Sequence, residues 1–88
     1  MNAFLFKIDE QFEKDEAKLR KENAKLAHKL WTLVFDIAKH PFDGLGKPEP
    51  LKGDLAGCWS RRIDEKHRLI YSVEKDIIHL LSCYGHYV

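Results

Sequence analysis

A proline- and glycine-rich segment, residues 40–57, most constrains how this chain of 88 residues can fold. The segment carries all three prolines and four of the five glycines, and both residue types interrupt regular elements. Apolar residues recur every three or four positions before it and every second position after it. The first spacing is typical of amphipathic helices and the second of half-buried strands. The sequence therefore predicts an α+β fold in which helices are followed by antiparallel strands.

The residues before this segment are predicted to form one strand and two helices. Apolar residues alternate over residues 4–8, which indicates a short first strand, and a helical spacing begins after Asp9. Asn23 is a suitable N-cap for a second helix, which must end near His40 because Pro41 cannot continue it. One long helix is the alternative, but Asn23 and the weak apolar stripe before it favour a helical hairpin. The apolar face of the second helix consists of Leu26, Leu30, Leu33 or Val34, and Ile37.

The residues after the segment are predicted to form three strands, over residues 58–64, 67–73 and 77–84. Short polar turns join them, as in an antiparallel meander. We expect both helices to pack on one face of this sheet. In the first of these strands, one face carries Trp59, Arg61 and Ile63.

Composition indicates a soluble, folded chain. Hydrophobic residues make up 44% and charged residues 33% of the sequence, with 15 Lys+Arg against 14 Asp+Glu. The longest apolar run, residues 3–6, is far shorter than the ~18–20 residues of a membrane span, and no signal-peptide pattern opens the chain. We therefore expect a single domain over residues 1–88, located in the cytoplasm, with Cys58 and Cys83 as free thiols.

Arginine is concentrated in the first predicted hairpin, which holds three of the four arginines, Arg61, Arg62 and Arg68. If residues 64–66 form the loop, Arg62 lies opposite Arg68 on one face of the sheet. Like charges so placed destabilise a strand pair unless an anion lies between them, and two guanidinium groups suit a phosphate. The alternative is two solvated arginines paired with neighbouring carboxylates.

Glu49 lies between Pro48 and Pro50, so its backbone is stiff and extended. Its carboxylate is thus held in the way that a positioned acid or base requires. Lys47 and Lys52 add positive charge on either side. The alternative is an ordinary polar loop residue.

His86 and Tyr87 lie at the end of the last predicted strand. A histidine suits proton transfer near neutral pH, and a tyrosine can stack on a nucleobase. The alternative is a frayed tail. Together with Glu49 and the arginines, these residues provide what metal-free RNA cleavage requires: a base, fixed cations and an acid. No metal-binding spacing such as C-x-x-C occurs, so neither a metal nor another cofactor is expected.

The order of these residues resembles the YoeB (Txe) toxins of the RelE/ParE superfamily. The resemblance implies a RelE-like microbial ribonuclease fold and a ribosome-dependent endoribonuclease that cuts mRNA in the A site. It also implies a YefM-like antitoxin, contact with operator DNA only through the antitoxin complex, and a homodimer as an allowed assembly. The resemblance covers about the second half of the chain. The residues that carry it are residues 40–52, Leu55, Gly57, residues 59–63 and 67–71, Cys83, and the His86–Tyr87 pair.

The resemblance also implies roles for the site residues. Glu49 would be the general base that activates the 2′-hydroxyl, and His86 would be the general acid for the leaving oxygen. Arg68 would stabilise the scissile phosphate, and Tyr87 would orient or stack on the substrate base. The further cations expected at the substrate are Lys47, Lys52, Arg61 and Arg62.

Two features of the tail differ from the family pattern. Val88 follows the tyrosine with which the family usually ends, and Tyr84-Gly85 replaces Arg-Tyr. The second change removes a cation and is expected to add flexibility beside His86.

Two other functional classes compete with an active nuclease. One is a gyrase-poisoning relative of the ParE type, which lacks this set of base, cations and acid. The other is a catalytically weak or inactive homologue that acts as an antitoxin-bound transcriptional co-repressor.

Overall fold

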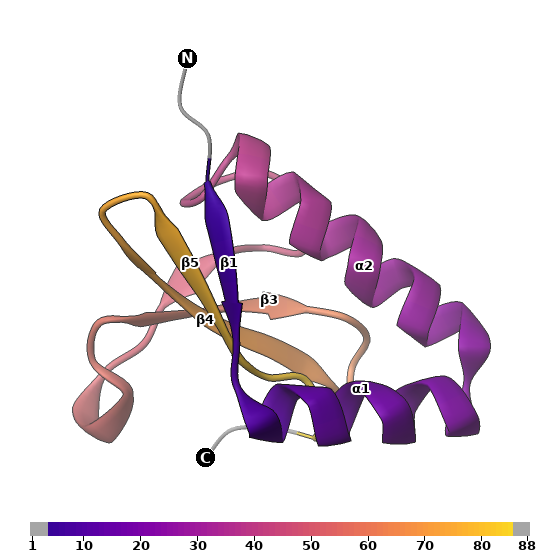
Figure 1. Cartoon of the computed structure of the whole chain (residues 1–88). Coiled ribbons are helices and arrows are strands. Elements are labelled where there is room, and N and C mark those ends of the chain that lie inside the picture. Colours follow the sequence, from indigo (N-terminus) through magenta and orange to yellow (C-terminus); the bar gives the residue numbers. More distant parts are fainter. Residues whose placement is uncertain (1–3, 86–88) are drawn as a thin grey trace.

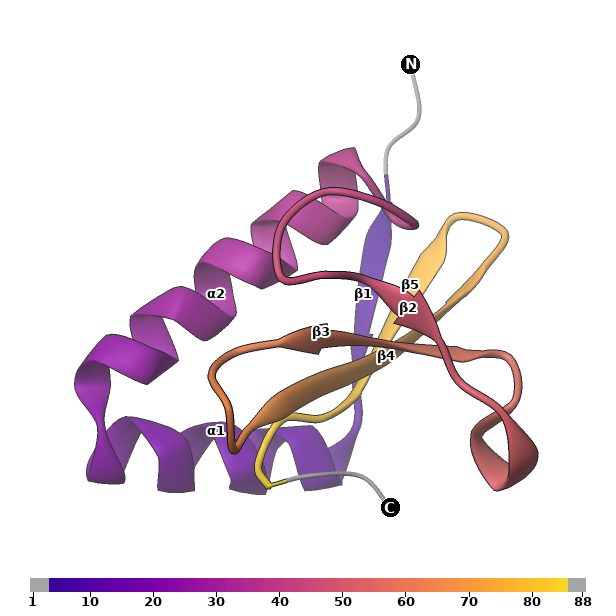
Figure 2. The ribbon, with the colours of Figure 1, turned by 180° about the vertical axis from the view of Figure 1, so that it is seen from behind.

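The computed structural model describes residues 4–85, which form two α-helices and a five-stranded sheet. The helices pack against one side of the sheet (Figure 1), and Figure 2 shows the same ribbon from behind. A short 3₁₀ helix, Gly53–Leu55, lies between the second and third strands. The other elements in chain order are β1 (Leu5–Ile8), α1 (Glu10–Glu22), α2 (Ala24–Lys39), β2 (Glu49–Pro50), β3 (Cys58–Arg62), β4 (Arg68–Glu74) and β5 (Ile77–Ser82).

The strands are arranged in the order β1-β5-β4-β3-β2. The predicted meander is confirmed, because β3, β4 and β5 pair as antiparallel neighbours. The predicted first strand is confirmed as β1, but its pairing and the strand β2 go beyond the prediction. The N-terminal strand β1 pairs in parallel with β5, and β2 forms inside the proline- and glycine-rich segment and pairs with β3.

The helical hairpin is confirmed, and its caps explain where each helix begins. The Asp9 side chain accepts a hydrogen bond from the Gln11 N–H (2.9 Å) at the start of α1. The Asn23 side chain accepts from the N–H groups of Lys25 (3.1 Å) and Leu26 (3.3 Å) at the start of α2. Both caps satisfy N–H groups that have no partner within the helix.

The core lies between the helices and the sheet. Alternate residues of β4, Leu69 and Tyr71, are fully buried there, as are Ile78 and Leu80 of β5. The apolar face predicted for the second helix packs against this core in α2, where Leu30, Leu33, Val34 and Ile37 are all buried. Side chains alternate between the two faces of a strand, so the residues next to these core positions in β4 and β5 point to the face opposite the helices.

Several strand ends differ from the prediction by one or two residues, and polar side chains account for those at the β3–β4 turn and at the end of β5. The β3–β4 turn takes in Ile63 and His67, because the Asp64 carboxylate accepts hydrogen bonds from Lys66 and His67 (2.6 Å for the His67 N–H). The last strand ends at Ser82 because the next main-chain N–H, that of Cys83, donates to the Asp15 carboxylate on α1 (3.0 Å).

Candidate active site

The strand register gathers three predicted site residues on the sheet face opposite the helices. Glu49 of β2 pairs with Ser60 of β3, and Arg62, two residues beyond Ser60, pairs with Arg68 of β4. Side chains two residues apart in a strand share one face. Glu49, Arg62 and Arg68 therefore lie on the same face of the sheet.

The predicted register of the arginine hairpin is confirmed. Arg62 and Arg68 are direct partners, and the Ile63 N–H donates to the His67 carbonyl (3.1 Å), so residues 64–66 form the loop. Asp64 stabilises this loop through its two main-chain hydrogen bonds. Burial acts to raise the pKa of Asp64, but the hydrogen bonds from His67 and Lys66 outweigh it and hold this pKa below its usual range.

The two arginines of this pair have different surroundings. Arg62 is exposed, whereas only 9% of Arg68 is exposed. The Arg68 Nη1 group donates to the carbonyls of Asp64 and His67 (3.1 Å for the second). These bonds fix the Arg68 side chain against the hairpin turn, so its charge is held in place before any ligand binds.

Glu49 is exposed and held by the sheet. Besides the pairing of Glu49 with Ser60, the Leu51 N–H donates to the Cys58 carbonyl (2.9 Å). On the other side, the Gly46 carbonyl accepts from the Arg62 N–H (2.7 Å). The segment that carries Glu49 is thus bonded to β3 before and after the glutamate, which agrees with the rigid presentation expected from the two prolines.

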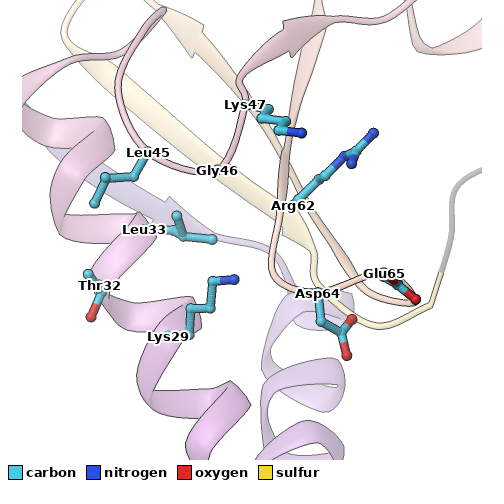
Figure 3. A pocket seen from close by; sticks show the side chains of 9 residues that line it. All are labelled: Lys29, Thr32, Leu33, Leu45, Gly46, Lys47, Arg62, Asp64 and Glu65. Atoms are coloured by element: carbon cyan, nitrogen blue, oxygen red, sulfur yellow. The ribbon is translucent and has the colours of Figure 1, made fainter.

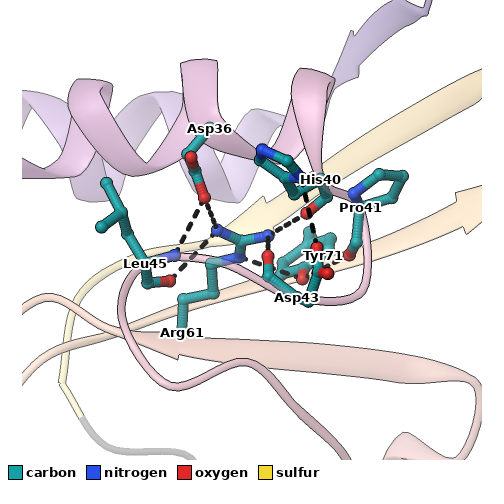
Figure 4. A network of polar contacts seen from close by, with 7 residues as sticks. All are labelled: Asp36, His40, Pro41, Asp43, Leu45, Arg61 and Tyr71. Atoms are coloured by element: carbon teal, nitrogen blue, oxygen red, sulfur yellow. Dashed lines mark hydrogen bonds and ion pairs between the residues drawn. The ribbon is translucent and has the colours of Figure 1, made fainter.

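The expectation that Arg61 contacts substrate is corrected by the structure. The Arg61 side chain is fully buried on the helix side of the sheet (Figure 4). Its Nη1 group binds the Asp36 carboxylate at 2.6 Å, and its Nε donates to the Tyr71 hydroxyl at 3.2 Å. Further bonds go to the carbonyls of His40, Asp43 (2.7 Å) and Leu45 (3.1 Å). This guanidinium group is occupied by the fold itself and is not available to a ligand.

Arg61 instead shapes the loop that leads to Glu49. The Asp36 carboxylate accepts a hydrogen bond from the Leu45 N–H (2.9 Å), and the Tyr71 hydroxyl donates to the Pro41 carbonyl (2.8 Å). Residues 41–45 are therefore tied to α2, β3 and β4 together. Sequence analysis missed Asp36 and Tyr71, although it placed Arg61 with Trp59 and Ile63, and that shared face was the available signal of burial.

This network also sets the charge state of its members. Burial acts to raise the pKa of Asp36, but the Leu45 N–H and the Arg61 guanidinium outweigh it and lower this pKa. Burial raises the pKa of the Tyr71 hydroxyl, an effect only partly offset by the hydrogen bond from Arg61. Asp36 therefore carries the negative charge that balances Arg61, while Tyr71 stays neutral.

A pocket of about 430 Å³ lies between α2, the loop before β2, and the β3–β4 turn (Figure 3). It brings together Arg62 and Lys47, two of the predicted substrate-binding cations, with Lys29 reaching in from α2. Lys52, the fourth predicted cation, is exposed and lies two residues after the end of β2. The complete lining consists of Lys29, Thr32, Leu33, Leu45, Gly46, Lys47, Arg62, Asp64 and Glu65.

The described chain ends beside Arg68. The Arg68 main-chain N–H donates to the Gly85 carbonyl (3.1 Å), and the Tyr84 hydroxyl donates to the Glu22 carboxylate on α1. Flexibility was expected at Gly85, but this residue is held by hydrogen bonds in a left-handed conformation (φ +77°), which glycine adopts readily. The predicted residues His86 and Tyr87 lie outside the described residues.

Residues 4–85 contain no group of three or more His, Cys, Asp or Glu side chains that could hold a metal ion. No helix in the same range is long and apolar enough to cross a membrane. Cys58 and Cys83 are both free thiols, as expected.

Comparison with known sequences identifies the family. Residues 8–87 match the sequence profile described as the YoeB-like toxin of bacterial type II toxin-antitoxin systems. The chain belongs to the YoeB-like toxin family. It is 51% identical to the toxin YoeB of Streptomyces coelicolor over 63 residues, which are 72% of this chain and 75% of that protein. The resemblance seen in the sequence is thereby confirmed.

Solved structures of family members share the fold. A YoeB–YefM complex from Staphylococcus aureus matches with a TM-score of 0.84 at 35% identity, over 96% of this chain and 98% of that one. A YoeB dimer from the same organism matches with a TM-score of 0.85 at 34% identity and the same coverage. The predicted RelE-like α+β fold is therefore confirmed.

Proposed function

We propose that this chain is a ribosome-dependent endoribonuclease that cleaves mRNA in the ribosomal A site and so inhibits translation. The observation that carries the proposal is the common sheet face of Glu49, Arg62 and Arg68. A carboxylate on the same sheet face as two guanidinium groups supplies a base and fixed cations, which attack on a phosphodiester requires. Membership of the YoeB-like toxin family supports the same reaction.

The proposed reaction needs no metal ion. Glu49 takes the proton of the ribose 2′-hydroxyl, and the 2′-oxygen attacks the adjacent phosphorus. Arg68 stabilises the charge that gathers on the phosphate oxygens. The bond from phosphorus to the 5′-oxygen then breaks, and His86 donates a proton to the leaving oxygen. The products are a 2′,3′-cyclic phosphate and a 5′-hydroxyl end. The role of His86, and that of Tyr87 in orienting the base, rest on the family resemblance.

The surrounding cations are proposed to hold the RNA backbone. Arg62 and Lys47 line one pocket, and Lys52 follows the strand that carries Glu49. Lysine and arginine contacts with phosphates position a nucleic acid without reading its sequence. The ribosome, which presents the A-site codon, then determines which phosphodiester bond is cleaved.

The proposed partners follow from the family members of known structure. Because a Staphylococcus aureus YoeB forms a complex with YefM, we assign this chain a YefM-like antitoxin that neutralises it. A YoeB of that organism also forms a dimer, and a homodimer is the assembly proposed here. Operator DNA is contacted only through the antitoxin complex. The place of action is the cytoplasm, where translating ribosomes are found.

A primer-extension assay on ribosomes stalled on a defined mRNA tests the proposal. The wild type is expected to cut within the A-site codon only when ribosomes are present, and His86→Ala is expected to cut far more slowly. Added antitoxin is expected to abolish cleavage. A folded wild-type protein that binds the antitoxin but cuts nothing would contradict the proposal and would favour the antitoxin-bound co-repressor instead.

A further inference from the structure

His67 connects the arginine hairpin to the end of the described chain. It directly precedes β4, and only 4% of the residue is exposed. Its ring nitrogen Nδ1 accepts a hydrogen bond from the Gly85 N–H at 2.8 Å, and its main-chain N–H donates to Asp64. The ring also packs on Tyr84, with the two ring centroids 4.4 Å apart.

The Nδ1 contact has a definite direction. A main-chain N–H can only donate, so Nδ1 must accept and can carry no proton in this arrangement. The histidine ring is thereby held as a fixed acceptor for one particular main-chain group. The site assigned above does not use this buried ring.

Both peptide groups that flank Gly85 are held. The N–H on one side donates to His67, and the carbonyl on the other side accepts from the Arg68 N–H at 3.1 Å. That carbonyl belongs to the peptide group that joins Gly85 to the following residue, His86. The main chain that leads to the proposed acid is therefore attached to His67, which precedes β4, and to Arg68, which begins it next to the proposed phosphate site.

We propose that His67 is a positioning residue, whose Nδ1 holds Gly85 so that the chain enters His86 beside Arg68. This inference rests on the proposed nuclease function and adds a residue to it. Misplacing a catalytic group by about 1 Å can lower a rate by ~100-fold, so a single fixed hydrogen bond at the residue before the acid is sufficient to matter. The effect should fall on kcat, because His67 acts through the tail and not on the bound RNA.

A packing role for the ring against Tyr84 is the competing explanation, and two variants separate it from positioning. His67→Asn places an amide oxygen at the same number of bonds from the backbone as Nδ1, so it retains an acceptor and loses the ring. His67→Phe retains a ring against Tyr84 and loses the acceptor. His28→Phe, at an exposed histidine of α2, is the matched control.

The test measures ribosome-dependent kcat and KM for these proteins, with antitoxin binding as the check on folding. Positioning predicts that His67→Phe loses tenfold or more in kcat at nearly unchanged KM, while His67→Asn stays within a few-fold of the wild type and of His28→Phe. If His67→Phe retains full activity, or if His67→Asn is the poorer enzyme, positioning through Nδ1 is overturned.

Hydrogen exchange of the Gly85 amide, followed by NMR on labelled protein, provides a readout that needs no activity. The amide is expected to be protected in the wild type and in His67→Asn, and unprotected in His67→Phe. An unprotected amide in the wild type overturns the inference even if cleavage is normal. If the wild type is inactive while the amide follows the expected pattern, the nuclease proposal fails and the attachment of the tail by His67 stands.

Discussion

The carboxylate of Asp36 and the guanidinium of Arg61 lie 2.6 Å apart, although the two residues are 25 positions apart in the chain. The contact joins the end of α2 to β3 on the buried side of the sheet. The main-chain carbonyls around it bind the remaining nitrogens of the same guanidinium group. One buried arginine thus fixes the loop that delivers Glu49 to the opposite face.

We predict that Arg61→Leu lowers the free energy of unfolding by about 3 kcal/mol or more, because it leaves Asp36 as an unpaired charge in a largely buried site. The double variant Asp36→Leu/Arg61→Leu should cost less than the sum of the two single changes by over ~1 kcal/mol. Urea denaturation measures all three. Lys14→Leu, which breaks an exposed ion pair with Glu10, is the control and should cost under about 1 kcal/mol. Strictly additive costs at positions 36 and 61 would contradict the coupling.

Local signals in the sequence were sufficient for the elements that depend on neighbouring residues. Asn23 marked the break between the helices because its short side chain can cap a helix within its own turn. The register of Arg62 and Arg68 followed from the length of one polar loop. Both are decided within a few residues, which is the range over which a single sequence is informative.

The features that were missed depend on partners far away in the chain. The parallel pairing of β1 with β5 joins the two ends of the chain, and nothing in residues 5–8 specifies that neighbour. Arg61 was assigned to substrate because arginine usually lies at the surface, whereas its burial depends on Asp36 and on carbonyls that converge only in the fold. The chemistry of Glu49 and Arg68 was nevertheless recognisable, because stiff prolines and strand alternation act locally.

We predict that acid destabilises the protein through Asp36 and Asp64, whose pKa values are lowered in the folded state. A carboxylate with a lowered folded pKa contributes stability above its unfolded pKa of ~3.9, and this contribution is lost as the pH falls through the folded value. The urea midpoint should therefore be flat near neutral pH and fall below about pH 4. Asp36→Asn should reduce this fall, whereas Asp54→Asn, at an exposed position, should not. A midpoint at pH 3 equal to that at pH 6 would contradict the assignment.

The two cysteines should differ in reactivity. Burial, followed by the nearby Asp15 and Glu16 charges, raises the pKa of the Cys83 thiol far above its ordinary value, and this residue is completely buried. Because the thiolate is the reactive form, Cys83 should resist alkylation in the folded protein. Cys58 is only partly buried and should react first. Peptide mapping after a short treatment with iodoacetamide measures both sites, and modification of Cys83 ahead of Cys58 would be the contrary result.

Binding to the ribosome should weaken as salt rises, because each phosphate contact releases counterions. Arg62 is exposed and lines the pocket between α2 and the β3–β4 turn, so Arg62→Gln should reduce the slope of log K against log salt by about one. Lys21→Gln, at an exposed position of α1, should leave the slope unchanged. Equal slopes for wild type and Arg62→Gln would remove Arg62 from the RNA contacts.

The most direct test of the central claim measures both the rate and the end groups of mRNA cleavage on stalled ribosomes. Wild type, Glu49→Gln and the control Glu13→Gln, at an exposed position of α1, are compared side by side. If Glu49 is the general base, wild type and control should release fragments with a 5′-hydroxyl end, and Glu49→Gln should be slower by about 10²–10⁴-fold. Wild-type rates in Glu49→Gln, or fragments that carry a 5′-phosphate, would contradict 2′-hydroxyl attack activated by Glu49.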